Sequence, residues 1–264
     1  YGLNLDDEIK LLNVIKKIDD NHALDLIPTF LGAHSIPDEF KDDCLSYTEL
    51  ICNEIIPKIS ELNLAKFCDV FCEKGYFNYE ISKKILETGK KFGLLPRLHA
   101  DEFNDSNGLK LAIEVGAFSV DHLMESNQSY FEALAQSNTV ATILPGTTFF
   151  LGQKNYVSAR KMIDKGCEIA LASDFNPGTC TINSLPQIIF LATMYCNITF
   201  EEAFKGITLN AAKSLGCHDS IGLIKSGYNA DILFWDIDSI YEIPYWFNSN
   251  RLLKILKSGK LIIF

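Results

Sequence analysis

The chain has 264 residues, 47% of them hydrophobic, and a formal net charge of −10 from 24 basic and 34 acidic side chains. This length suits one large α/β domain with a small appendage, or two domains, with enough residues to bury a sizeable core. Nucleic acids and anionic membranes require a concentrated positive field in their partners, so the acidic balance argues against both.

The sequence carries no evident signal for a membrane or a secretory destination. Its longest apolar stretch, residues 188–196, is far shorter than the roughly 20 residues that span a bilayer. The eight cysteines are scattered through apolar segments without a C-x-x-C pair. That distribution is typical of reduced core thiols rather than of a disulfide framework or a zinc knuckle. We therefore expect a cytoplasmic protein.

Short apolar runs recur along the chain and predict β-strands. Each run has strand length, is rich in β-branched or aromatic residues, and ends in polar or turn residues. In chain order, the expected strands occupy residues 26–34, 65–73, 94–102, 117–123, 139–146 and 168–175. Their nearly continuous hydrophobicity indicates burial on both faces, as in a parallel sheet.

Amphipathic segments between and after these runs predict helices. They occupy residues 47–62, 79–93, 107–117, 129–138, 156–167, 184–196 and 199–215. Gly93 stands where a C-cap glycine is expected, and Thr199 precedes two acids as an N-cap would. The pattern assigns no element to residues 1–25. The strict alternation of strands and helices predicts an α/β fold.

The alternation leaves two α/β architectures open. A closed (β/α) barrel needs eight strand–helix units, two more than the sequence provides. An open doubly wound sheet usually carries a glycine-rich phosphate loop after its first strand, and neither G-x-G-x-x-G nor G-x-x-x-x-G-K-[ST] occurs here. From about residue 218 onward, short β-like runs without a long amphipathic helix predict a small β-rich appendage over residues 218–264.

Polar side chains gather at the ends of the predicted strands, which is where (β/α) barrels carry their chemistry. The strand-end residues are His34, Glu73, His99 with Glu102, His122, Pro145-Gly146 and Asp174. Histidines and carboxylates together suit a metal site or general acid–base catalysis. A turn-capping role is the structural alternative for Asp174. His99 and Asp174 alone do not make a metal site, because zinc or iron sites need at least three protein ligands.

Six stretches, taken in order, carry a resemblance to a known family. They are "TFLGAH", "HADEF", "DHL", "TILPGTTFFLG", "ASDFNPGT" and "TLNAAKSLG" at residues 29–34, 99–103, 121–123, 142–152, 172–179 and 208–216. Across essentially its whole length the chain resembles the imidazolonepropionases, amidohydrolase-superfamily enzymes of histidine degradation. The resemblance implies a (β/α)8 TIM-like amidohydrolase barrel over residues 1–217, followed by part of a small β-sandwich domain over residues 218–264.

The resemblance also implies one metal ion, zinc or iron. Its ligands would include His99, on the fifth barrel strand, and Asp174, on the eighth. The family's other two ligands form a His-x-His on the first strand, followed by a substrate-clamping arginine, and no His-x-His occurs here. The likeness places Tyr1 at the end of the second strand. Together these features predict an amino-terminally truncated fragment whose barrel lacks its first two strands.

Further roles follow from the resemblance residue by residue. Glu102, His122 and Asp174 are the expected catalytic residues, with Glu102 handling protons and His122 beside the scissile carbonyl. The expected substrate-binding residues are Tyr1, His34, Glu102, Asn176, Gly178 and Thr179. Arg97 and Asp101 are expected to support the site structurally.

The implied reaction is the hydrolysis of the cyclic amide of 4-imidazolone-5-propanoate to N-formimidoyl-L-glutamate. The resemblance also implies that the full-length protein is a homodimer. The expected partner is thus a small-molecule substrate, and the fragment by itself is expected to be inactive. Two alternatives stay open: a related deaminase of a guanine- or cytosine-like ring, and a non-catalytic barrel. Joint retention of the strand-end histidines and acids argues against the second.

Overall fold

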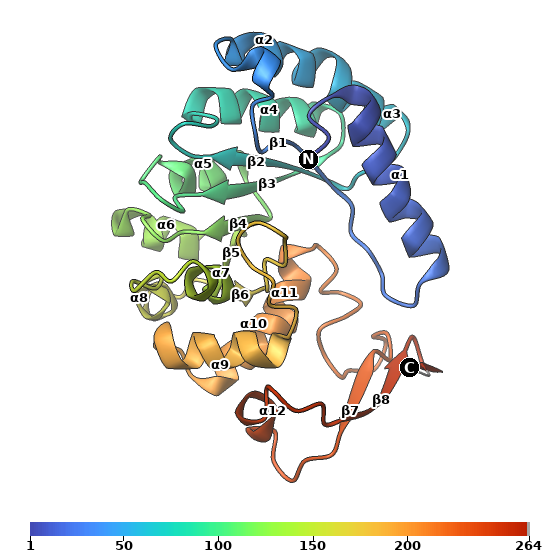
Figure 1. Cartoon of the computed structure of the whole chain (residues 1–264). Helices are drawn as coiled ribbons and strands as arrows, with labels where there is room; N and C mark the ends of the chain where they lie inside the picture. Colours follow the sequence, from blue (N-terminus) through green and yellow to red (C-terminus); the bar gives the residue numbers. More distant parts are fainter. Residues whose placement is uncertain (263–264) are drawn as a thin grey trace. The chain divides into compact units, whose positions relative to one another are not determined.

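A computed structural model describes residues 1–262, and the chain divides into two compact units between Thr139 and Val140. In each unit parallel strands alternate with helices, which confirms the α/β class (Figure 1). Each of the six runs predicted as strands contains one strand.

Four parallel strands form the sheet of the first unit, in the order β1-β2-β3-β4. They are β1 (Thr29–Ala33), β2 (Phe67–Cys72), β3 (Leu95–Ala100) and β4 (Ser119–His122). Neighbours in the sheet are also neighbours in the chain, as expected when each helix returns the chain to the next parallel strand.

The helices of the first unit are α1 (Leu5–Asn21), α2 (Cys44–Leu50), α3 (Ile56–Glu61), α4 (Tyr79–Lys91), α5 (Gly108–Val115) and α6 (Phe131–Ala135). Asn78 caps α4 by accepting from the Ile81 N–H at 3.0 Å, and Gly93 follows the helix with a φ of 83°, as predicted. Helix α1 was not predicted from the sequence, although Asn4 caps it and three acids fill its first turn.

The helix predicted over residues 47–62 contains a wider π-helical segment, Ile51–Ile55, between α2 and α3. Pro57 lies in the first turn of α3 and has no N–H to donate, and the Ile56 N–H bonds to the Ile51 carbonyl, five residues back. A proline inside a helix removes one bond of the regular ladder and displaces the preceding turn. The amphipathic period predicts the helix but not this irregularity.

Alternation along the strands separates an apolar and a polar face of the first sheet. On the helix side, Gly89 of α4 lies so close to Cys68 that an added Cβ would stand 2.9 Å from the Cys68 Cβ, and Gly108 of α5 approaches Ala100 in the same way. On the other side, Asp69 is paired with Arg97 in the β2–β3 register. Because side chains two residues apart share a face, Arg97 and His99 lie on this polar side.

The second unit contains a parallel pair, β5 (Val140–Ile143) and β6 (Ile169–Leu171). Its helices are α7 (Pro145–Phe150), α8 (Ala159–Asp164), α9 (Leu185–Tyr195), α10 (Phe200–Ile207), α11 (Leu209–Ser214) and α12 (Glu242–Tyr245). Thr199 and Glu202 form a complete capping box on α10, so the predicted N-cap is confirmed.

Two predicted strand ends in the second unit were placed too late. β6 ends at Leu171, so Asp174 lies in the following loop rather than on the strand. Pro145 and Gly146 open α7 instead of closing β5. Proline favours the first helical turn, where its missing N–H has no partner to lose.

The tail carries a separate antiparallel sheet, β7 (Ile232–Trp235), β8 (Leu252–Lys257) and β9 (Lys260–Ile262), in that order. The predicted β-like runs are therefore confirmed, except that residues 263 and 264 of the last run lie outside the described part. The eight cysteines all lie in described residues and none forms a disulfide. Among residues 1–262, no helix combines the length and the apolar character needed to cross a bilayer.

Candidate functional site

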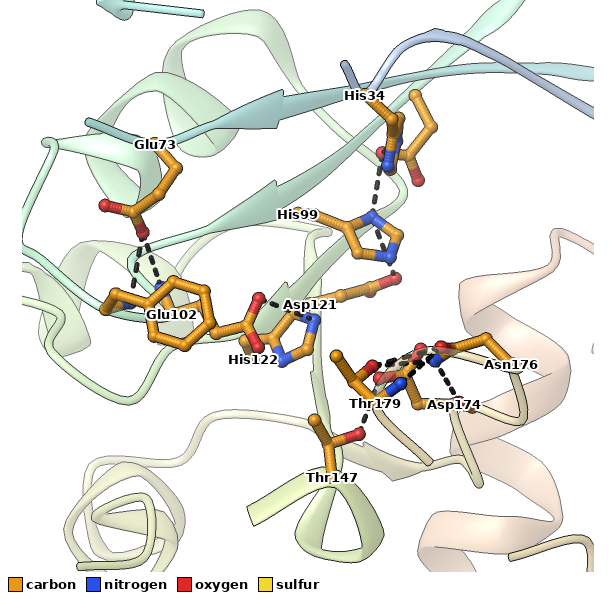
Figure 2. Close-up of polar contacts among 12 residues, drawn as sticks. His34, Glu73, His99, Glu102, Asp121, His122, Thr147, Asp174, Asn176 and Thr179 are labelled. Carbon is orange, nitrogen blue, oxygen red and sulfur yellow. Dashed lines mark hydrogen bonds and ion pairs between the residues drawn. The ribbon is translucent and has the colours of Figure 1, made fainter. Parts of the chain in front are cut away.

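The polar face of the first sheet carries a buried carboxylate, Asp69, between His34 and His99, and Figure 2 labels both histidines. Asp69 Oδ1 lies 2.9 Å from His99 Nδ1 and 3.0 Å from His34 Nε2. Asp69 comes from the middle of β2, His99 from β3, and His34 directly follows β1. Asp69 is only 1% exposed and His34 5%. A carboxylate buried this deeply is stable only when it is fully hydrogen-bonded.

The environment sets the charges of these groups in a consistent way. Burial lowers the pKa of His34 below its ordinary value, more than the hydrogen bond with Asp69 raises it. Burial acts to raise the pKa of Asp69, but the charge of His99 and the hydrogen bonds from both histidines outweigh it and hold the pKa well below the usual range. At neutral pH the site therefore contains an ionised carboxylate beside a neutral His34 imidazole.

A second carboxylate, Asp121, lies opposite His99 in the register of β3 and β4. Arg97 Nη2 donates to Asp121 Oδ2 at 3.3 Å, and Asp121 Oδ2 lies 3.9 Å from His99 Nδ1. Ser119 donates to the other oxygen of Asp121. Arg97 Nε is also 3.9 Å from Asp69 Oδ2. Arg97 thus balances two buried acids, which supports the structural role expected for it.

His122 ends β4 and faces Glu102, with 3.6 Å between His122 Nε2 and Glu102 Oε2. The rings of His122 and His99 are 5.4 Å apart. Burial, and after it the nearby charge of His99, holds the pKa of His122 well below its ordinary value. A neutral imidazole next to a carboxylate can donate a hydrogen bond and exchange a proton.

The backbone at these strand ends departs from the extended conformation. Asp101 and His122 have φ angles of 53° and 77°, in the left-handed region. Such a conformation costs a residue other than glycine about 1–3 kcal/mol and is concentrated at functional sites. The left-handed residues end β3 and β4 and turn the chain, so that Glu102 and His122 no longer follow the alternation of the strands.

The loop that carries Glu102 is held by two buried acids. Glu73 Oε2 accepts from the N–H groups of Glu102 at 3.0 Å and Phe103 at 3.1 Å, and its other oxygen accepts from Asn104 Nδ2 at 3.1 Å. Asp101 accepts from three further backbone N–H groups, those of Ser106, Gly108 and Leu109. The predicted supporting role of Asp101 agrees with these contacts. Glu73 extends that role to the end of β2.

In the second unit, a compact loop contains the other predicted site residues. Asn176 Oδ1 accepts from the N–H groups of Gly178 at 2.9 Å and Thr179 at 2.7 Å, and its Nδ2 donates to the Asp174 carbonyl at 2.8 Å. Thr147 Oγ1 on α7 donates to Asp174 Oδ2 at 2.5 Å. Asp174 has a φ of 54°. Asn176 therefore shapes the turn through its own side chain, as asparagine does in Asx turns.

The structure groups the predicted site residues within each unit. His34, His99, Glu102 and His122 lie together in the first, and the Tyr1 ring lies 5.2 Å from the His34 ring. Asp174, Asn176, Gly178 and Thr179 share one loop of the second. Asp69, Asp121 and Thr147 were not predicted as site residues, and no role was predicted for Glu73. A signal was available for Asp69, because a charged residue inside the apolar run "FCDVFC" is rarely buried without a partner.

The first-unit cluster is chemically suited to a metal ion. Metal-binding histidines usually direct their second ring nitrogen at a carboxylate, which orients the ring and makes it a better ligand. Asp69 stands in that position for His99. His34, Asp69 and His99 also offer ligand atoms within 4.8 Å of one another, so a group of this kind could contact an ion directly as well.

Comparisons with known proteins show which family the chain resembles. The profile of the amidohydrolase family matches residues 99–262. The imidazolonepropionase of Thermoanaerobacter pseudethanolicus is 44% identical over 258 residues, which cover 98% of this chain and 62% of that protein. The imidazolonepropionase of Bacteroides fragilis is 42% identical over 263 residues, covering 99% of this chain and 63% of that protein. The chain therefore spans less than two thirds of the length of these relatives.

Solved structures of low sequence identity share the fold. A 5-methylcytosine deaminase from Klebsiella pneumoniae matches 98% of this chain and 68% of its own with a TM-score of 0.75 and 18% identity. A guanine deaminase from C. acetobutylicum matches 99% of this chain and 70% of its own with a TM-score of 0.73 and 17% identity. The predicted α/β amidohydrolase fold is thus confirmed. With a family profile matched over more than half of its residues, the chain belongs to the amidohydrolase family.

Proposed function

We propose that this protein is a metal-dependent imidazolonepropionase, which hydrolyses the cyclic amide of 4-imidazolone-5-propanoate to N-formimidoyl-L-glutamate. The observation that carries the proposal is the full-chain similarity to imidazolonepropionases at 40–44% identity, together with the clustering of His34, His99, Glu102 and His122. Those relatives are longer than this chain, so the proposal concerns the protein at its native length.

In this proposal a single zinc or iron ion is held by His99 and Asp174. The remaining ligands come from the part of the native-length protein that this chain does not include. A bound ion of this kind supplies a water molecule of lowered pKa and polarises a carbonyl. Asp69 keeps the His99 ring in place through the 2.9 Å contact with Nδ1, so His99 would bind the ion through Nε2. Imidazole and carboxylate ligands suit zinc and iron alike.

The residues of the chain divide the remaining work. Tyr1, His34, Asn176, Gly178 and Thr179 bind and orient the substrate. The N–H of His122 donates to the oxygen that becomes negative when water adds to the ring carbonyl, and one such donor contributes about 3–4 kcal/mol. His122 suits this role because burial keeps it neutral, with a proton to donate.

Glu102 moves the proton in the proposed reaction, with Asp174 as the second carboxylate that can carry it. Water adds to the carbonyl carbon, the bond from this carbon to the ring nitrogen breaks, and the nitrogen leaves with a proton delivered by a carboxylate. The 3.6 Å contact between Glu102 and His122 keeps the proton carrier beside the oxyanion donor. General acid–base assistance of this kind contributes about 10²–10⁴-fold.

We further propose that the protein is a cytoplasmic homodimer, and that residues 1–217 belong to the catalytic barrel and residues 218–264 to a small β-sandwich domain. The separate antiparallel sheet β7–β9 supports the second domain. Light scattering of the purified protein at its native length gives the subunit number directly.

The function is tested with the purified, metal-analysed protein at its native length and 4-imidazolone-5-propanoate. We expect loss of the ring absorbance and N-formimidoyl-L-glutamate as the product in mass spectrometry, with activity removed by a chelator and restored by zinc or iron. Guanine and cytosine are assayed in parallel for ammonia release. Ring opening without ammonia supports the proposal, whereas ammonia release or inertness of the metal-loaded protein overturns it.

A further inference from the structure

Asp69 is unusual because one of its oxygens faces two functional histidines. Oδ1 lies 2.9 Å from Nδ1 of His99 and 3.0 Å from Nε2 of His34. The two imidazole rings meet edge to face, with centroids 4.6 Å apart and planes at 77°. Neither ring can therefore turn without disturbing the other or leaving the carboxylate.

An ionised carboxylate can only accept hydrogen bonds. Both nitrogens that face Oδ1 must then carry a proton, Nδ1 in His99 and Nε2 in His34. An imidazole with one proton has its lone pair on the opposite nitrogen, and this is the form that His99 takes when it binds a metal ion through Nε2. The same oxygen thus selects opposite tautomers in the two rings.

We propose that Asp69 is a positioning residue that fixes both tautomers and so assigns the two histidines different tasks. His99, protonated on Nδ1, presents the Nε2 lone pair to a metal ion. His34, protonated on Nε2, presents the Nδ1 lone pair as an acceptor, so it recognises an N–H or O–H donor of the ligand rather than a carbonyl. The metal and substrate tasks rest on the proposed function, but the tautomers do not.

The neighbourhood of Asp69 supports a dedicated role rather than incidental burial. Its side chain is 2% exposed, so an unpaired charge there would be costly. The nearest cation, Arg97, stands 3.9 Å from the other oxygen, beyond hydrogen-bonding distance. The two imidazoles therefore supply the closest described donors to this carboxylate.

The tautomers are measured directly by nitrogen-15 NMR of histidine-labelled protein at neutral pH, in metal-free and zinc-loaded forms. Signals are assigned by their loss in His34→Gln and His99→Gln. We expect a protonated Nδ1 in His99 and a protonated Nε2 in His34. A His34 ring that carries its proton only on Nδ1, or a His99 ring that lacks a proton on Nδ1 in either form of the protein, overturns the proposal.

Zinc affinity provides the second measurement, by competition with a chromophoric chelator. Loss of a partner that orients a metal-bound histidine typically weakens metal binding about 10–100-fold, and we expect this for Asp69→Asn. The matched control is Cys68→Ala, which alters the adjacent residue of β2 on the side packed against α4. We expect it to lower stability but to leave zinc affinity unchanged.

The two measurements separate this inference from the proposed function. Unchanged zinc affinity in folded Asp69→Asn overturns the positioning role. If the unsubstituted protein binds no zinc or iron, the proposed function fails, while the NMR tautomers still decide the inference. If Asp69→Asn does not fold, Asp69→Glu takes its place, and the NMR spectra of the unsubstituted protein still establish or refute the two tautomers.

Discussion

At the scale of single residues, the cluster on the first sheet contains buried polar groups, and each of them would be unstable there without its hydrogen-bond partners. Asp69 is accommodated because His34 and His99 donate to it, and Asp121 because Arg97 and Ser119 do. Removing one member leaves a buried polar group without its partner, which costs more than the hydrogen bond itself contributed. Substitutions here are therefore expected to have large and specific effects.

The first prediction separates metal binding from proton transfer. We expect His99→Ala to lose the metal, because it removes one ligand, and Glu102→Gln to keep the metal but lose about 10²–10⁴-fold in turnover. Glutamine keeps the shape of Glu102 but cannot carry a proton. Elemental analysis and the ring-opening assay on both variants measure this. Equal metal loss in both variants would make Glu102 a ligand, and near-normal turnover in Glu102→Gln would remove it from the mechanism.

The second prediction concerns Glu73, which accepts from the backbone of the loop that carries Glu102. In Glu73→Gln, one accepting oxygen becomes a donor, and each buried N–H left unsatisfied costs about 1–3 kcal/mol. We expect faster amide exchange at Glu102 and Phe103 together with lower turnover. The exposed Glu125 provides the control, since Glu125→Gln should change neither quantity. Unaltered exchange protection in Glu73→Gln would contradict the anchoring role.

At the scale of elements, two helices pack closely against the first sheet on the side opposite its polar face. Gly89 lets α4 lie directly on Cys68 of β2, and Gly108 lets α5 lie on Ala100 of β3. The helix-facing side of these strands is therefore packed at close to crystal-like density. Asp69 and His99, on the opposite face, are held by their own hydrogen bonds.

The third prediction tests this packing with Gly89→Ala. On an exposed helix position, alanine would stabilise by about 1 kcal/mol relative to glycine. At Gly89 the new Cβ would stand 2.9 Å from the Cys68 Cβ, and overpacking of this kind typically costs about 1–3 kcal/mol. We expect a lower free energy of unfolding in denaturant titration. Glu87→Ala, on the exposed side of α4, should leave stability equal or higher, and a stabilised Gly89→Ala would disprove the tight contact.

At the scale of the whole molecule, the burial of the cysteine side chains determines how readily they react. Six of the eight are buried, namely Cys52, Cys68, Cys72, Cys167, Cys180 and Cys196. Burial raises the pKa of Cys72 to about 11 and that of Cys196 to about 12. The reactive form of cysteine is the thiolate, so a raised pKa and lack of access both slow modification.

The fourth prediction follows from that burial. With an alkylating reagent at pH 8, we expect Cys44 and Cys217, which are partly exposed, to react first, and the six buried thiols to react only on unfolding. Peptide mapping by mass spectrometry after timed quenching identifies the modified sites. Rapid modification of Cys68 or Cys72 in native protein would show that the first sheet opens readily.

The local pattern of the sequence determined the elements of this fold. Apolar runs located all six parallel strands, and Asn78, Gly93 and Thr199 marked helix ends where they were expected. Such features depend on neighbours a few residues away, so they can be read from sequence alone. Helix α1 and the π-helical segment before Pro57 were not predicted from the sequence. The last parallel strand was predicted to extend to Asp174, beyond its end at Leu171.

The sequence also pointed to the chemistry, because His34, His99, Glu102 and His122 stand at strand ends and match a known family. Only the tertiary structure decided which group holds the histidines. Asp69 lies 35 residues from His34 and 30 from His99 along the chain, and within its own strand it is one acid in an apolar run. The register of β1, β2 and β3 brings the three side chains to one face, and their burial there turns this proximity into a strong, directional interaction.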